Sequence, residues 1–369
     1  MSMPPPERHG GNLAATAGRL GCRPSQLLDA SASLVPFGPP WALRLALLGV
    51  SAGAPLRLRA YPDRDYAALR AALAGFHGLS PDAVLPGNGA AELFTWAARD
   101  GAAAGVSVLP QPGFGDYPRA LACWAGAWRA QPLPLQPAGE PQVQPHRFPA
   151  PPAGEVLWIT NPHNPTGQLW SRVSLEPLLG RFALVIVDEA FLPLVPAGED
   201  QSLIPLVAAH PNLVVIRSLT KLFAIAGLRL GYAVAQPQRL RRWAGWRDPW
   251  PVNGLAAAAG EGLLGNPAAC RRWCRRVQRW TAREGTWLQQ QLAQLPGIRP
   301  LPSAANFLLI RGDSSLVPLR ERLERRHHIL LRDCRSFDGL GPDWLRIGYQ
   351  SHRHNRRIIG ALRQELAER

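Results

Sequence analysis

The chain has 369 residues, of which 46% are hydrophobic and 18% are charged, a balance that excludes a disordered protein and suits one large and one small domain. Its formal charge of +15 suits anionic ligands, but no lysine-rich tract or aromatic-basic repeat predicts binding to nucleic acid. The five cysteines form no CxxC pair, and no apolar run is long enough for a signal peptide or a membrane span. We therefore expect a cytoplasmic protein without a metal site.

Three segments follow one another along the chain. Residues 1–35 are polar and rich in turn-forming residues, and they predict an N-terminal arm with one short helix near Leu13 to Leu20. Residues 36–248 predict the large domain, with an amphipathic helix at 64–77 and a proline-rich surface connection at 130–155. Residues 249–369 combine long arginine-rich helices with the strand-like runs ANFLLIRG, HILLRDC and DWLRIGYQ, and they predict a smaller α+β domain.

The large domain predicts an α/β fold. Its short buried runs SVLPQPGF, EVLWITNP, RFALVIVDEAF, NLVVIRSLTK and GLRLGYAVA alternate with helices, a pattern typical of a mostly parallel central sheet sandwiched by helices. Ligands of such sheets bind beyond the carboxyl ends of the strands. Four polar groups are expected there, at residues 87–92, 161–167, 188 and 218–221. Each group is weakly diagnostic alone, but their order and spacing together indicate one site.

Lys221 is the only lysine among the 41 lysines and arginines of the chain. Arginine keeps its charge in proteins, so it cannot act as an amine nucleophile. A lysine amine can lose its proton and form a Schiff base with a carbonyl compound. A codon bias that left one lysine by chance is the alternative, and the motif around Lys221 weighs against it.

The motifs NPHNPTG, VIVDEAF, SLTKLFAIAGLRLGY and LRIGY occur in the order typical of class I/II aminotransferases. The chain therefore resembles this group of fold-type I pyridoxal-phosphate enzymes over most of its length. The resemblance implies pyridoxal 5′-phosphate as cofactor. It also implies that Lys221 holds the cofactor as a Schiff base and moves the Cα proton, that Asp188 pairs with the pyridinium nitrogen, and that Asn164 bonds the ring hydroxyl.

The same resemblance implies the remaining cofactor contacts. Ser218 and Arg229 would hold the phosphate, together with the free N–H groups of a helix that opens at Gly89, Ala90 and Ala91. Phe114 would stack on the ring. Tyr61 would reach the phosphate of a neighbouring subunit, so a homodimer is expected.

Three further segments resemble threonine-phosphate decarboxylases: HGGN at residues 9–12, LLDASASLVPFGPP at 27–40, and ILLRDC at 329–334. These enzymes convert O-phospho-L-threonine into (R)-1-amino-2-propanol O-phosphate in cobalamin biosynthesis. The resemblance implies that His9, Gly10 and Arg332 bind the substrate phosphate and that Arg346 binds its carboxylate, although both arginines could take either anion. Ser33 stands where these relatives usually have asparagine, which leaves the exact substrate open.

Phe191 occupies the position at which many aminotransferases carry a tyrosine that touches the ring hydroxyl. This departure and the HGGN segment favour the decarboxylase. An aminotransferase of the histidinol-phosphate type is the alternative, because it uses the same cofactor contacts and also binds a phosphorylated amino compound. A nucleic-acid-binding regulator on this fold is disfavoured, because the residues before the fold are too few for a winged-helix domain.

Overall fold

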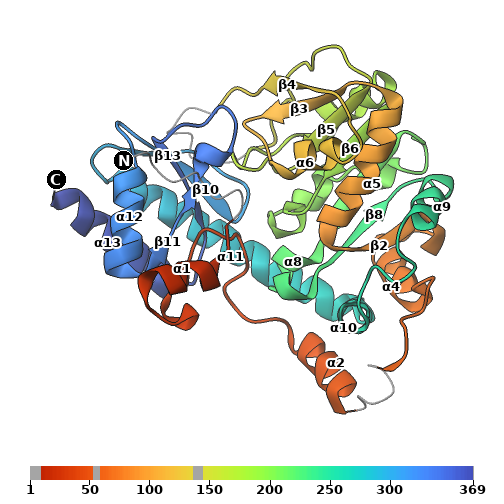
Figure 1. The fold of residues 1–369 in the computed structure, drawn as a ribbon, viewed down its shortest axis with the longest axis horizontal. Coiled ribbons are helices and arrows are strands. Elements are labelled where there is room, and N and C mark those ends of the chain that lie inside the picture. The colour runs from red at the N-terminus through yellow and green to blue at the C-terminus, as the bar shows by residue number, and fades with distance from the viewer. Residues whose placement is uncertain (1–9, 53–58, 136–143, 369) are drawn as a thin grey trace.

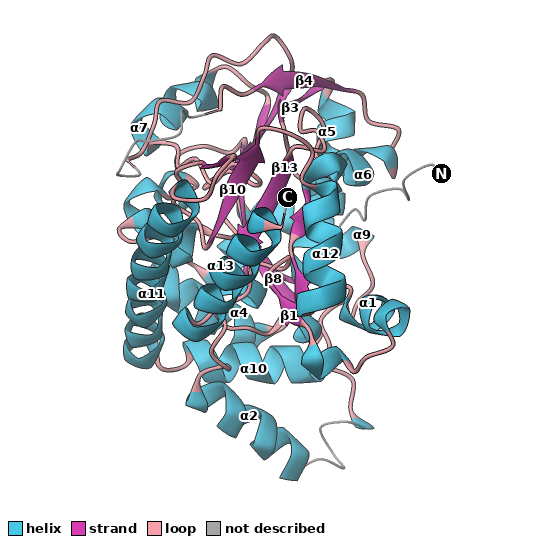
Figure 2. Ribbon diagram, turned by 90° about the vertical axis from the view of Figure 1, so that its left-hand side faces the viewer, coloured by secondary structure: helices cyan, strands magenta, loops and turns pink. Residues whose placement is uncertain are grey.

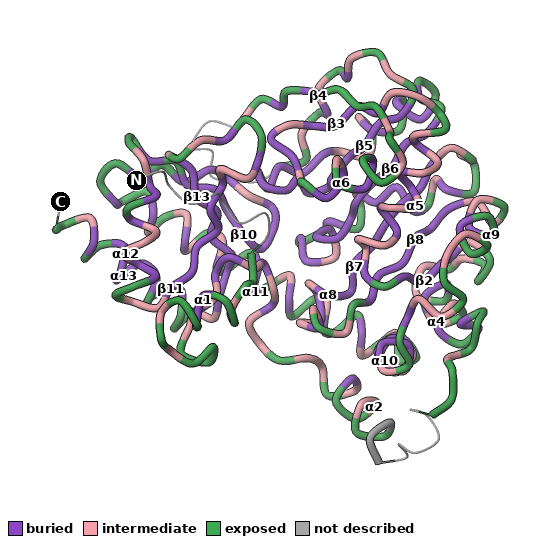
Figure 3. The backbone as a smooth tube through the Cα atoms, viewed as in Figure 1, coloured by how far each residue is buried: buried purple, intermediate pink, exposed green. Residues whose placement is uncertain are grey.

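The structure is a computed structural model that describes residues 10–52, 59–135 and 144–368. A central sheet with helices on both faces forms the larger part, and a small sheet covered by helices lies beside it (Figure 1). Burial follows this plan, because the central strands are buried along their length while the outer helices alternate between buried and exposed residues (Figure 3).

The central sheet has seven strands in the order β2-β8-β7-β6-β5-β3-β4. The strands are β2 (Val84–Asn88), β3 (Ser107–Gln111), β4 (Trp128–Pro132), β5 (Val156–Thr160), β6 (Leu184–Asp188), β7 (Leu213–Ser218) and β8 (Leu230–Val234). Strands β3 to β7 pair in parallel, and β8 runs antiparallel to β7 and β2. The predicted mostly parallel sheet is therefore confirmed.

Strand β4 overlaps the start of the segment 130–155 that the sequence predicts as a surface connection. Four of its five residues are exposed, so no buried apolar run marked it as a strand. It nevertheless pairs with β3 along its whole length and closes one edge of the sheet.

Apolar side chains cover both faces of the central sheet, as expected for parallel strands between helices. Leu184 and Ile186 pack toward α5 (Gly89–Ala104) and α6 (Asp116–Ala122), whereas Val185 and Val187 belong to the core on the other face. That second core also takes residues of α4 (Ala67–His77), α10 (Gly254–Leu264) and α11 (Pro267–Ala293). The remaining helices of this part are α2 (Trp41–Ala52), α7 (Arg172–Leu175), α8 (Leu219–Leu222) and α9 (Pro237–Trp246).

The small sheet is antiparallel in the order β12-β13-β10-β9. Its strands are β9 (Ile298–Pro300), β10 (Phe307–Gly312), β12 (Arg332–Asp333) and β13 (Trp344–Gly348). Figure 2 shows α11, α12 (Val317–His327) and α13 (His352–Ala367) beside it. The strands predicted from the three apolar runs are all present.

The described part of the N-terminal arm packs against the C-terminal part of the chain (Figure 1). After α1 (Leu13–Leu20), strand β1 (Leu28–Asp29) pairs in parallel with β11 (Ile329–Leu330). The helix predicted at Leu13 to Leu20 is confirmed at both ends. The domain boundaries remain a prediction, because one continuous hydrophobic core joins residues on both sides of the expected boundary at residue 248.

Candidate active site

One pocket collects most of the residues that the sequence predicted for the site. It lies where β5, β6 and β7 end, and residues of the arm and of the small sheet close its other side. The predicted residues that line it are Gly10, Ser33, Ala90, Ala91, Phe114, Asn164, Asp188, Ser218, Lys221, Arg229, Arg332 and Arg346. His9 lies outside the described residues.

Lys221 projects into this pocket from α8, directly after β7. Burial lowers the pKa of its amine to about 8, and the charges of Arg346 and Arg229 act in the same direction. The amine nitrogen lies 5.9 Å from the centroid of the Phe191 ring. A lysine with a pKa near 8 is neutral in a useful fraction of molecules at neutral pH, as an amine nucleophile requires.

Asp188 ends β6 at the floor of the pocket. Its Oδ2 accepts a hydrogen bond of 2.7 Å from the Tyr117 hydroxyl, and its Oδ1 accepts one of 2.9 Å from the Ala190 backbone N–H. Burial raises the pKa of Asp188 to about 6, although these two hydrogen bonds oppose the shift. A carboxylate held in this way prefers a cationic partner, and a protonated ring nitrogen would provide one.

The absence of a side chain at Gly89 lets the Arg229 guanidinium lie against the start of α5. Gly89 has φ +73°, and a Cβ built on it would lie 2.5 Å from the nearest guanidinium nitrogen of Arg229. Gly89 also begins α5, and the preceding Asn88 makes no side-chain cap with the first turn. Free N–H groups at a helix start, together with a guanidinium and the Ser218 hydroxyl, suit a phosphate group.

Asn164 lies in the pocket and contacts Arg346, the residue predicted to bind the substrate carboxylate. Its side-chain oxygen accepts a hydrogen bond from Arg346, so its amide NH₂ is the group left to donate to a ring hydroxyl. The neighbouring Phe114 packs edge-on against Phe94 and Tyr117, with interplanar angles of 73° and 84°. These contacts fix the Phe114 ring at the pocket wall, where it could stack on a planar cofactor.

Arg332 and Arg346 are directly opposite each other on the antiparallel strands β12 and β13. Both side chains are buried, with 4% and 7% of their surface exposed. Burial lowers the pKa of Arg346 to about 10, and the charge of Arg332 adds to this shift. The Nε of Arg346 has no hydrogen-bond partner. Two buried like charges across a strand pair are unfavourable alone, so they suit a ligand that carries two anionic groups.

Several pocket residues were not predicted from the sequence. They are Ser31, Ala32, Phe94, Asp116, Ala190, Thr220 and Phe337, and Tyr117 lies behind them as the partner of Asp188. Asp116 and Tyr117 begin α6, two and three residues after Phe114, so the same turn of chain places all three. The PGFGDY segment therefore contains all three residues, although only Phe114 is predicted from it.

Tyr61 does not line the pocket of its own chain. It is 75% exposed, and its ring stacks on Trp250 at 4.2 Å between centroids. Its expected role at a neighbouring subunit's site stays a prediction. Within the described ranges, no group of histidine, cysteine, aspartate and glutamate side chains could hold a metal ion, and no helix is long and apolar enough to cross a membrane.

These residues fit pyridoxal 5′-phosphate. The pocket offers an amine for the aldehyde, a buried carboxylate for the ring nitrogen and an amide for the ring hydroxyl, and it offers Arg229, Ser218 and the first turn of α5 for the phosphate. Apart from Tyr61 and Gly89, each cofactor contact predicted from the sequence lines this pocket, and the individual roles stay predictions.

Comparison with known proteins agrees with this geometry. The sequence profile described as aminotransferase class I and II matches residues 35–362. Threonine-phosphate decarboxylase of Salmonella typhimurium is 36% identical over 97% of this chain and 96% of that protein. Histidinol-phosphate aminotransferase of Symbiobacterium thermophilum is 34% identical, covering 90% and 89%.

The fold comparison gives the same picture. The crystal structure of L-threonine-O-3-phosphate decarboxylase from Porphyromonas gingivalis has a TM-score of 0.78 at 25% identity, and the match covers 92% of this chain and 100% of that one. The fold-type I architecture is therefore shared along nearly the whole chain. The chain belongs to the class I and II aminotransferase family, whose cofactor is pyridoxal 5′-phosphate.

Proposed function

We propose that the protein decarboxylates O-phospho-L-threonine to (R)-1-amino-2-propanol O-phosphate, a reaction of cobalamin biosynthesis. The observation that carries the proposal is the buried pair Arg332 and Arg346, which faces the same pocket as Lys221. Phosphothreonine carries a phosphate and a carboxylate, so one molecule can neutralise both guanidiniums. The 36% identity to a threonine-phosphate decarboxylase over almost the full length supports the same substrate.

When bound, pyridoxal phosphate supplies an electron-withdrawing ring that stabilises negative charge at the substrate Cα. Lys221 would hold the cofactor and would then be the nearby amine that carries a proton to or from Cα. Asp188 would keep the ring nitrogen protonated, because a buried carboxylate stabilises a cation next to it. Tyr117 holds Asp188 in place through its 2.7 Å hydrogen bond.

The choice of reaction depends on which bond of Cα is held perpendicular to the cofactor ring. Arg346 is fixed by hydrogen bonds to Asn164 and to the Ser31 carbonyl, so an anion bound to it takes a defined position. Arg332, opposite on β12, would hold the second anionic group. Two fixed anchors orient the substrate and decide which Cα bond is cleaved. We assign the phosphate to Arg332, Gly10 and His9, and the carboxylate to Arg346.

A second candidate function is transamination of a histidinol-phosphate-type compound. The 34% identity to a histidinol-phosphate aminotransferase favours it, and the cofactor contacts would be the same. Phe191 packs edge-on against Phe307 at 5.1 Å and brings no hydroxyl to the cofactor ring. This feature, together with the HGGN segment, supports the decarboxylase over the aminotransferase.

We also propose a homodimer in which Tyr61 completes the site of the neighbouring subunit. The exposed Tyr61 lies beyond α2, whose Trp41, Leu45 and Leu48 are exposed by 66%, 51% and 58%. Exposed apolar surface of this kind marks an interaction surface. A cytoplasmic location is part of the proposal, and it is supported by five cysteines that are all free thiols.

The deciding experiment measures carbon dioxide release from phosphothreonine by the purified holoenzyme, with threonine and histidinol phosphate as controls. Release from phosphothreonine without added 2-oxoglutarate supports the decarboxylase. Transfer of the amino group of histidinol phosphate to 2-oxoglutarate, with no carbon dioxide from phosphothreonine, would assign the second function.

A further inference from the structure

Arg332 and Asp333 form the short strand β12, and neighbouring residues of a strand project to opposite faces. Arg332 faces the pocket, where its Nη2 donates a 2.6 Å hydrogen bond to the Ser336 hydroxyl. Asp333 faces α12, where the Nε of Arg320 lies 3.8 Å from its Oδ2. The anchoring of Asp333 therefore fixes the base of the Arg332 side chain.

Arg335 holds the Asp333 carboxylate through both its backbone and its side chain. The backbone N–H of Arg335 donates to its Oδ1 at 3.0 Å, and the Arg335 Nη2 donates to its Oδ2 at 2.6 Å. Burial alone would raise the pKa of Asp333, but the hydrogen bonds from Arg335 and the charge of Arg320 lower it. Asp333 therefore stays ionised, with Arg335 as its hydrogen-bond donor and Arg320 of α12 as a longer, purely ionic contact.

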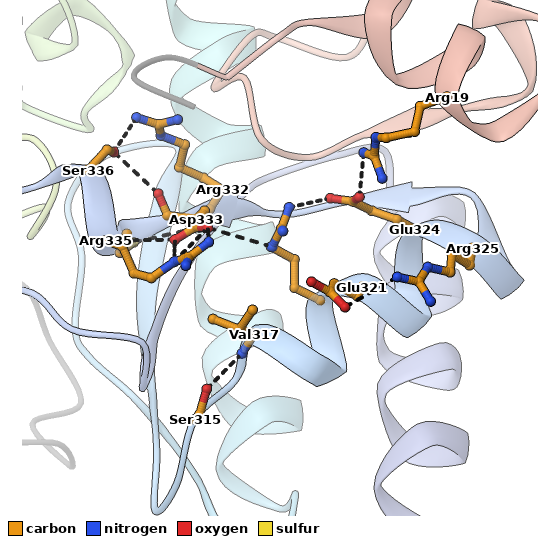
Figure 4. A network of polar contacts seen from close by, with 12 residues as sticks. Arg19, Ser315, Val317, Glu321, Glu324, Arg325, Arg332, Asp333, Arg335 and Ser336 are labelled. Atoms are coloured by element: carbon orange, nitrogen blue, oxygen red, sulfur yellow. Dashed lines mark hydrogen bonds and ion pairs between the residues drawn. The ribbon is translucent and has the colours of Figure 1, made fainter. Parts of the chain in front are cut away.

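Glu324 connects α12 to the N-terminal arm (Figure 4). It is only 3% exposed, and its two oxygens bind different helices. Oε1 accepts a hydrogen bond from Arg320 one turn earlier on α12, and Oε2 accepts one of 2.8 Å from Arg19 on α1. A buried carboxylate shared by two arginines places both, because each would lose its partner if the carboxylate moved.

The N-terminal arm, which carries Arg19, also contributes to the pocket. Helix α1 begins at Leu13, three residues after Gly10, which lines the pocket. Gly10 packs so closely that a Cβ built on it would lie 2.5 Å from the Ser31 carbonyl oxygen. The Gly11 N–H donates a 3.0 Å hydrogen bond to the Ser31 hydroxyl. A shift of α1 would therefore move the backbone of the pocket wall.

We propose that Glu324 is a positioning residue for the substrate phosphate. Glu324 pairs with Arg19 on α1, the helix that follows Gly10 of the pocket lining. It also pairs with Arg320, which in turn contacts Asp333, the neighbour of Arg332. Glu324 does not line the pocket and acts only through these neighbours. The proposal rests on the proposed function, since it takes the phosphate to bind between Gly10 and Arg332.

Three variants test this role in the holoenzyme. Glu324→Gln keeps the shape and removes the charge, and Arg19→Ala removes only the arm side of the contact. Glu321→Gln is the matched control, because Glu321 lies on the same helix and pairs with Arg325 at 3.4 Å, where Arg325 is 67% exposed. Glu324→Gln should raise KM for phosphothreonine about tenfold and leave kcat within about twofold, because a misplaced anchor weakens binding. Arg19→Ala should act in the same direction with a smaller effect, and the control should match the wild type.

Hydrogen exchange gives a second readout that requires no turnover. The α1 amides should exchange faster in Glu324→Gln and in Arg19→Ala than in the wild type or in Glu321→Gln, while the α11 amides stay unchanged. Unchanged exchange in α1 overturns the proposal. Faster exchange throughout the chain, or a fall in kcat at constant KM, also overturns it, because these results indicate a general structural role.

The two proposals fail in different ways. If the wild type releases no carbon dioxide from phosphothreonine, the proposed function fails, and the same variants are compared on histidinol phosphate, which also carries a phosphate. A KM increase in Glu324→Gln with either substrate supports the positioning role. Equal KM values for Glu324→Gln and Glu321→Gln contradict it, whichever reaction the enzyme catalyses.

Discussion

The two sides of the pocket are built in different ways. On the cofactor side, Asp188 and Ser218 end the neighbouring parallel strands β6 and β7, and Lys221 follows β7, so the sheet alone brings them together. On the substrate side, Gly10 comes from the arm, while Arg332 and Arg346 come from the small sheet. The cofactor side therefore comes from one sheet, whereas the substrate side combines the arm with the separate small sheet. Substitutions on the two sides should have different kinetic signatures.

The largest effect is expected on the cofactor side, at Lys221. Lys221→Arg should keep the positive charge and lose all measurable turnover, because a guanidinium does not form a Schiff base. Borohydride reduction of the wild-type holoenzyme should label this residue alone, since no other lysine exists. Peptide mapping that finds the label on the N-terminal amine would contradict the assignment.

Asp188→Asn should lower kcat by several orders of magnitude and weaken cofactor binding. The amide cannot stabilise a protonated ring nitrogen, so the ring loses much of its ability to stabilise charge at Cα. Single-turnover kinetics and a cofactor titration measure the two effects. A rate near that of the wild type would mean that another group supplies the counter-charge.

Loading of the apoenzyme with cofactor should depend on pH through Lys221. Burial and neighbouring arginines lower the pKa of its amine to about 8, so the reactive neutral form predominates above this pH. Below pH 8 the neutral fraction falls about tenfold per pH unit, and the loading rate should fall with it. Stopped-flow absorbance between pH 6 and 11 measures the profile. A midpoint near 10.5 would show that the amine is not desolvated.

On the substrate side, Arg332→Ala should weaken the binding of phosphothreonine and leave the binding of threonine nearly unchanged. A charge-assisted contact is worth roughly 1.5–3 kcal/mol, so affinity for phosphothreonine should fall about tenfold to a hundredfold. Arg346→Ala is the comparison, and it should weaken the binding of both substrates equally because both carry the carboxylate. Equal losses for both substrates in Arg332→Ala would reverse the assignment of the two anions.

The smallest effect is expected for Tyr117→Phe, which removes the 2.7 Å hydrogen bond to Asp188 but keeps the ring. The loss of one hydrogen bond should lower kcat about threefold to tenfold. Tyr66→Phe is a suitable control, because the Tyr66 hydroxyl bonds the Val252 carbonyl outside the pocket. Equal effects of the two substitutions would show that Tyr117 acts only through packing.

The contrast between the two sides also explains what could be predicted from the sequence. Lys221, Asp188 and Asn164 lie in short motifs next to recognisable strands. The sequence could therefore predict both their chemical type and their position at the ends of the strands. Tyr117 was missed because its role depends on the side-chain contact with Asp188 across 71 residues. The burial of Glu324 could not be predicted, because its segment has the composition of a charged surface helix and its contact with Arg19 joins residues far apart in the chain.

Arg332 and Arg346 were both selected from the sequence, but their mutual arrangement was not. They are 14 residues apart along the chain, and only the pairing of β12 with β13 shows that they are direct cross-strand neighbours. Strand β4 was missed for a related reason, since its exposed residues carry no apolar pattern. In each case a tertiary contact supplied information that local composition lacks.

The facing arginines have a consequence for stability. Like charges directly opposite each other in a sheet destabilise it, so replacing either arginine by an apolar side chain should raise the temperature of unfolding. Under the proposed function, the pair becomes favourable only while a doubly anionic ligand is bound.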